Sequence, residues 1–114
     1  MAKISLQKEN ISHNELLEIR NILKDKIDII EESHFEYNDV KITTSLYEKY
    51  YFRASNAVAA TITTIEYNNK IEVDILSAGG ANNPIIRFSW GSEEDFNQLL
   101  AEYYIKKGFV EIKK

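Results

Sequence analysis

The segment Ser77-Ala78-Gly79-Gly80-Ala81-Asn82-Asn83-Pro84 is the part of this chain best suited to hold a small anionic or polar ligand. Successive glycines let backbone N–H groups converge on a phosphate or a carboxylate. Such a site would be formed by Ser77, Gly79, Gly80, Asn82 and Asn83. A phosphate loop normally leads into a helix, whereas Asn83-Pro84 disfavours one. A plain connection between two strands, with glycines at positive φ, is therefore the favoured alternative.

A second feature is the aromatic run formed by Tyr47, Tyr50, Tyr51, Phe52 and Arg53. Alternation along a strand puts Tyr47 and Tyr51 opposite the face that carries Leu46, and we expect their face to be exposed. Exposed tyrosines beside an arginine are typical of protein interfaces. Tyr47, Tyr51 and Arg53 are therefore predicted to form an interaction surface. The alternative is a strand end whose rings cover their neighbours.

Catalytic and metal-binding patterns are weak in this chain. It has no cysteine, and neither His13 nor His34 has a ligand-type residue at metal spacing. The neighbouring carboxylates of Glu31-Glu32 and of Glu93-Glu94-Asp95 point apart, which does not suit paired acid–base catalysis. No Ser-His-Asp order or Gly-x-Ser-x-Gly elbow is present. We therefore expect no metal, no cofactor and no catalytic residue, and a protein that is more readily a binder than an enzyme.

Length and charge narrow the class of protein. The chain of 114 residues fits one domain, residues 1–114. Its net charge of −4 argues against nucleic acid as a partner, because nucleic-acid binders normally have a basic surface. The first ten residues contain no long apolar run, so we expect neither a signal peptide nor a membrane anchor. The expected location is the cytoplasm.

Two helices are predicted from caps and from apolar spacing. Ser12-His13-Asn14-Glu15 has the form of a capping box, and an apolar stripe follows it, which indicates a helix over residues 13–26. Arg20 is expected to face away from that stripe. The second helix begins near Ser92 and ends before Gly108, which suits a left-handed position after a helix. A short strand is expected to follow it.

The residues between these helices predict strands. The strongest pattern is a hairpin of residues 57–67 and 70–76, because asparagines at 68 and 69 tolerate the positive φ of a tight turn. Pairing Tyr67 with Lys70 then places Ile62 opposite Ile75 on an apolar face. Further strands are expected at residues 27–37, from residue 40 onward and at 85–90. In the strand from residue 40, the buried face is expected to carry Val40, Ile42, Thr44 and Leu46.

The expected fold is a two-layer α+β domain. It has an antiparallel sheet of four or more strands, with an N-terminal and a C-terminal helix packed on one face. Three segments, Leu46–Tyr51, Ile75–Gly80 and Gly91–Phe96, resemble a family of small bacterial proteins catalogued only as a domain of unknown function. The resemblance covers about residues 38–105. It implies the α+β architecture and a cytoplasmic setting, and it implies no activity.

These observations predict a non-catalytic binding or interaction module that self-associates through its sheet or its tyrosine surface. The alternative is a protein that holds a small anionic or polar ligand in the loop from Ser77 to Asn83. An enzyme is the third choice, since α+β sheets serve all three classes of function.

Overall fold

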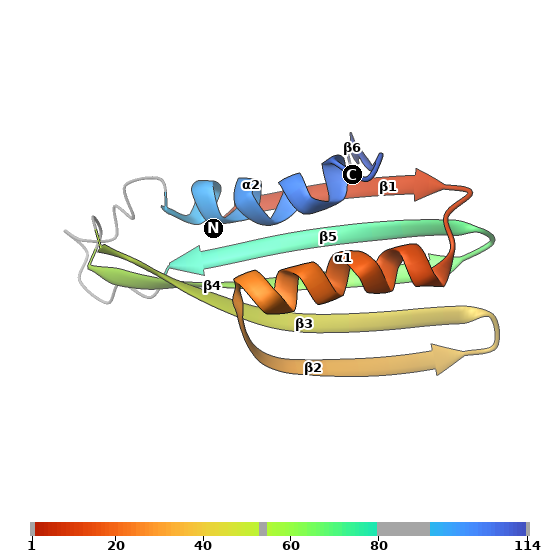
Figure 1. Cartoon of the computed structure of the whole chain (residues 1–114), viewed down its shortest axis with the longest axis horizontal. Helices are drawn as coiled ribbons and strands as arrows, with labels where there is room; N and C mark the ends of the chain where they lie inside the picture. Colours follow the sequence, from red (N-terminus) through yellow and green to blue (C-terminus); the bar gives the residue numbers. More distant parts are fainter. Residues whose placement is uncertain (1, 53–54, 80–91, 114) are drawn as a thin grey trace.

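The structure is a computed structural model that describes residues 2–52, 55–79 and 92–113. The predicted strand at residues 85–90 lies outside the described residues. Figure 1 shows the elements in chain order. They are β1 (Ala2–Glu9), α1 (His13–Lys26), β2 (Asp28–Tyr37), β3 (Val40–Tyr51), β4 (Asn56–Tyr67), β5 (Lys70–Gly79), α2 (Ser92–Ile105) and β6 (Val110–Ile112).

The strands form one antiparallel sheet in the order β2-β3-β4-β5-β1-β6. The predicted α+β class with an antiparallel sheet of at least four strands is confirmed. The expected order, with a helix first, is wrong because β1 precedes α1. Strand β1 pairs with β5, and Ala2 lies opposite Ser77. The first strand therefore enters the sheet beside β5 and not beside β2, the next strand in the sequence.

The β4–β5 hairpin has the predicted register. Tyr67 pairs with Lys70, and Ile62 lies opposite Ile75. Asn68 and Asn69 have φ values of 51° and 58°, the left-handed conformation that asparagine tolerates better than most residues. Because the turn and the apolar pattern favour the same pairing, a one-residue slip would turn buried side chains toward solvent.

Both helices have the predicted ends, set by local hydrogen bonds and by glycine. Ser12 and Glu15 form the capping box, in which each side chain accepts from the backbone N–H of the other residue. Beyond α2, Gly108 adopts a φ of 97°. The Phe109 ring then packs edge-on against the Tyr104 ring, with 5.4 Å between the ring centroids. Among the described residues, no helix is long and apolar enough to span a membrane.

The buried core joins residues from both helices with alternate residues of β1, β4 and β5 in one cluster. It includes Leu6, Leu16, Ile19, Leu23, Val58, Ile62, Val73, Ile75, Phe96 and Leu100. Leu99 of α2 is partly buried and packs against this cluster.

Strand β3 turns the opposite face inward from the one predicted. Thr43, Ser45 and Tyr47 are buried, whereas Ile42 and Leu46 are only half-buried. The reason lies in the neighbouring strand: Thr43 pairs with Thr64, and Tyr47 pairs with Ala60. Cross-strand partners point to the same side of a sheet, so the face of β4 that packs on the core fixes the face of β3.

Candidate functional site

A cleft of about 350 Å³ lies between the N-terminal half of α1 and strands β2, β3 and β4. His13, Leu17 and Arg20 border it from the helix, because spacings of four and three residues place them on one helix face. We call this the α1 cleft. Its strand side is formed by His34, Phe35, Glu36, Lys41, Ile42, Thr43 and Glu66.

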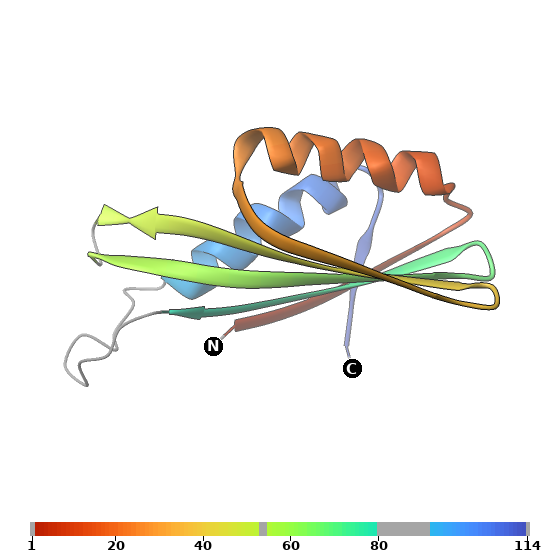
Figure 2. The same cartoon turned by 90° about the horizontal axis from the view of Figure 1, so that it is seen from below.

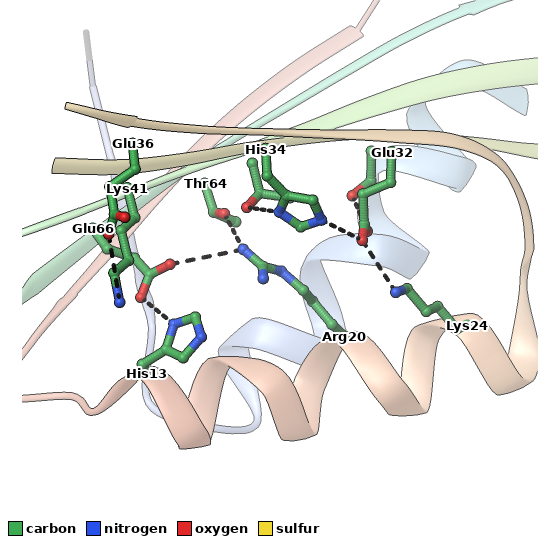
Figure 3. Close-up of polar contacts among 11 residues, drawn as sticks. His13, Arg20, Lys24, Glu32, His34, Glu36, Lys41, Thr64 and Glu66 are labelled. Carbon is green, nitrogen blue, oxygen red and sulfur yellow. Dashed lines mark hydrogen bonds and ion pairs between the residues drawn. The ribbon is translucent and has the colours of Figure 1, made fainter.

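Arg20 is the most deeply buried charged group of the α1 cleft, with 4% of the residue exposed. Its Nη2 donates a hydrogen bond of 2.7 Å to Thr64 Oγ1 and lies 3.8 Å from Glu66 Oε2 (Figure 3). The other carboxylate oxygen, Glu66 Oε1, lies 2.7 Å from His13 Nδ1. The expectation that Arg20 faces away from the apolar side of the helix is therefore wrong. Its long stem crosses the buried layer and delivers the guanidinium to polar partners on β4.

Glu32 on β2 is the centre of a second polar cluster beneath α1. It accepts hydrogen bonds from Lys24 Nζ at 3.1 Å, from Ser45 Oγ at 2.7 Å and from His34 Nε2 at 3.1 Å (Figure 3). Burial raises the pKa of this carboxyl, but the bonds from Ser45 and Lys24 and the charges of Lys24 and His34 outweigh burial, and the pKa is lowered. The ionised carboxylate therefore ties α1 to β2 and β3.

The chain Glu32–His34–Thr43 has the order of acid, imidazole and hydroxyl found in hydrolytic triads. His34 Nδ1 lies 3.0 Å from Thr43 Oγ1. However, His34 is the direct cross-strand partner of Thr43, and Glu32 lies two residues from His34 on the same face of β2, so strand geometry alone accounts for both contacts. The contacts therefore fit structural support better than catalysis.

Metal binding has no support in the described part of the chain. No group of three or more histidine, aspartate or glutamate side chains there is arranged to hold a metal ion. His13 and His34 both border the α1 cleft, yet each ring is engaged with a different glutamate.

The model of a family of unknown function, DUF6054, matches residues 1–106. The chain belongs to this family. The match includes β1 and α1, which the sequence resemblance over residues 38–105 left out, and it contains every residue of the α1 cleft. A comparison with curated proteins found no match.

One residue of the tyrosine surface predicted for this DUF6054 protein, Tyr47, does not lie on the surface. Tyr47 is 1% exposed and lies in the core, and the Tyr51 ring packs edge-on against Phe96 at 6.3 Å. Burial, with the charge of Glu32 adding to it, raises the pKa of Tyr47. The expected exposure of Tyr47 is wrong because the face of β3 is inverted. Arg53 lies outside the described residues.

Part of the predicted anion-binding loop of this DUF6054 protein is described. Ser77 is buried, and its hydroxyl donates to Asn97 Oδ1 on α2, while Asn97 Nδ2 donates to the Ile75 carbonyl at 3.2 Å. Gly79 pairs with Val58 at the end of β5. Gly80, Asn82 and Asn83 lie outside the described residues, so the loop site stays a prediction. The Ser77 hydroxyl already donates to Asn97, so it is not a free donor for a ligand in this site.

The sequence contained a signal for the α1 cleft that its motifs did not reveal. In the predicted hairpin, Glu66 falls on the mainly apolar face, opposite Ile71. A carboxylate on a buried face requires a polar or cationic partner, because an isolated buried charge is costly. Arg20 lies at helical spacing from Leu16 and Leu23, which places it on the inner side of α1 where it can supply that partner.

Proposed function

We propose that this protein is a non-catalytic interaction module that self-associates through one face of its sheet. The observation that carries the proposal is a group of large, exposed apolar side chains on the face of the sheet that points away from the buried cluster, which we call the open face. Large apolar side chains on it are between 39% and 65% exposed; they are Phe35, Tyr37, Tyr50, Leu76 and Val110. The strand register places all of them on this same face.

The proposal takes both helices to lie on the other face. Support comes from the Arg20 bond to Thr64, which attaches α1, and from the Ser77 bond to Asn97, which attaches α2. Thr64 and Ser77 belong to the alternating set of residues that packs on the core. Figure 2, where the two helices are drawn on the same side of the strands, agrees with this placement. Monomeric proteins rarely leave a large apolar patch uncovered, so the open face is expected to have a partner.

The size of the open face suits a stable protein interface. Strand β5 has ten residues, and β1 to β5 lie side by side in the sheet. At about 3.4 Å per residue and about 4.8 Å between strands, five such strands cover roughly 800 Å². One side of a standard protein–protein interface is also about 800 Å².

A second copy of the chain is the partner that the chemistry of the open face favours. Its middle strand, β4, presents only uncharged side chains there: Ala57, Ala59, Thr61, Thr63 and Ile65. On β5, Lys70 pairs with Glu72 within the same strand, with Nζ 3.7 Å from Oε1, and Asp74 is the third charged residue of this strand on the open face. An uncharged strip gives a charged partner nothing to recognise, whereas a twofold axis brings the strip onto itself.

The open face also has a place for a side chain of the partner. A hollow of about 200 Å³ lies where the small residues Ala59, Thr61 and Ala78 are flanked by Leu46 and Leu76. A protruding apolar side chain from the second copy can fill it. Such filling of a hollow at the centre of an interface is characteristic of residues that dominate binding energy.

The test compares two variants that carry the same added charge. Thr61→Glu places a carboxylate in the middle of the open face, and Asn21→Glu places one on the exposed side of α1. In sedimentation equilibrium, we expect a wild-type dimer, a dimeric Asn21→Glu control and a monomeric Thr61→Glu variant whose circular dichroism shows an intact fold. A wild-type monomer at high concentration contradicts self-association, and a dimeric Thr61→Glu variant contradicts this interface.

A further inference from the structure

The α1 cleft shares Phe35 with the open face, and its charges are balanced. Arg20 and Lys41 contribute two positive charges, and Glu36 and Glu66 contribute two negative charges when both histidines are neutral. Its volume of about 350 Å³ falls within the range of small-molecule sites. From the geometry given below, we propose that the α1 cleft binds a free α-amino acid in its zwitterionic form.

The buried guanidinium of Arg20 and one buried carboxylate oxygen of Glu66 have unused hydrogen-bonding capacity in the α1 cleft. A guanidinium carries five N–H donors, and Arg20 gives one hydrogen bond to a described residue, Thr64. Glu66 Oε2 is buried and has no hydrogen-bond partner among the described residues. Since buried polar groups are normally hydrogen-bonded, both groups are suited to a ligand that supplies an acceptor for one and a donor for the other.

The spacing of these two groups selects the class of ligand. Arg20 Nη2 and Glu66 Oε2 are 3.8 Å apart. In an α-amino acid the nitrogen and the carboxyl carbon are two bonds apart, about 2.5 Å, so its two charges are similarly close. The ligand ammonium group can donate to Glu66 Oε2 while the ligand carboxylate accepts from Arg20, a charge-assisted pairing that guanidinium groups favour.

Two further residues of the α1 cleft distinguish this ligand from a bare ion. Lys41 is about half exposed at the strand side of the cleft, where Nζ lies 4.0 Å from Glu36 Oε2, and it adds a second cation for the carboxylate. Leu17 borders the same cleft from the helix. An apolar side chain on the ligand gains contact with Leu17, so leucine is the probe of choice.

The experiment is a titration of the full chain, labelled with nitrogen-15, followed by its backbone amide spectrum. The probes are leucine, isovalerate, which lacks the ammonium group, and 3-methylbutylamine, which lacks the carboxylate. We expect leucine to produce saturable shifts at amides of α1 and β4 that border the cleft, and neither of the other two compounds to do so. Lys41→Met and Glu66→Gln are each expected to weaken leucine binding by about tenfold or more.

Lys24→Met is the matched control for Lys41→Met, because it also removes a lysine. Lys24 lies on α1 and pairs with Glu32 outside the α1 cleft. It should leave leucine affinity within about twofold of the wild type. The proposal is overturned if leucine gives no saturable shift at millimolar concentration, or if isovalerate binds as well as leucine. Because the Lys41 side chain is about half exposed, Lys41→Met leaves the fold intact. The proposal is also overturned if Lys24→Met weakens leucine binding as much as Lys41→Met does.

Discussion

Replacing Arg20 by methionine tests how strongly the buried polar cluster holds α1 to the sheet. Methionine keeps an unbranched stem and removes the guanidinium, so Glu66 loses a cation whose Nη2 lies 3.8 Å from Oε2. At an effective dielectric constant of about 20, two unit charges at this distance attract by about 4 kcal/mol. The Thr64 hydroxyl also loses a charged donor, a bond that contributes about 1.5–3 kcal/mol.

These losses are partly offset because the variant no longer removes a guanidinium from water. Breaking a buried pair by deleting one partner costs about 3–5 kcal/mol, and we expect Arg20→Met to lower the free energy of unfolding by that amount. Urea unfolding followed by circular dichroism measures it. Glu66→Gln on the Arg20→Met background should restore about 1–3 kcal/mol, because it removes the carboxylate left without its cation.

Lys24→Met is the control for this cycle, since Lys24 is 40% exposed and its pair with Glu32 should contribute less than about 1 kcal/mol. If Arg20→Met costs under about 1 kcal/mol, the buried cluster is not a stabilising attachment. If the two substitutions at Arg20 and Glu66 add to within about 0.5 kcal/mol, the coupling between their side chains is refuted.

The lowered pKa of Glu32 predicts that its contribution to stability is present above the ordinary glutamate pKa of about 4.3 and is lost as the pH falls through the lower folded value. Glu32→Gln should therefore lose less stability than the wild type between neutral and acid pH in urea unfolding; equal losses contradict the assignment. The raised pKa of Tyr47 predicts that Tyr47→Phe removes one tyrosine from the ionisation that accompanies alkaline unfolding. If an ultraviolet titration of Tyr47→Phe shows one fewer tyrosine ionising while the protein is still folded, the burial of Tyr47 is contradicted.

Elements with their own local signals could be predicted from the sequence. The capping box at Ser12 and the asparagine turn between β4 and β5 each depend on residues close together in the chain. β1 was missed although Ile4 and Leu6 alternate with polar residues, because its partner strand begins at residue 70. Local pattern shows that a segment can be a strand, but it does not show where in the sheet the strand lies.

The α1 cleft and the face of β3 could not be predicted in the same way, because both depend on distant residues. Thr43 and Ser45 look solvent-exposed in isolation, and Ile42 looks buried. Pairing with β4 sets this reversed burial, and the inner hydroxyls are tolerated because they bond to polar side chains of β2, His34 and Glu32. A polar side chain is expected to be exposed only when the protein interior offers it no hydrogen-bond partner. The cleft combines positions 13, 20, 41 and 66, which share no motif.

The position of β1 has a consequence for how the chain folds. Ala2 pairs with Ser77, whereas β2, β3, β4 and β5 each pair with the strand next to them in sequence. Contacts between distant residues form slowly because a long loop must close first. During synthesis, β1 emerges first and finds its place only after β5 has left the ribosome. Ile4 and Leu6 lack their β5 partners over that interval, so β1, which precedes the other strands, is among the last of them to reach its native place.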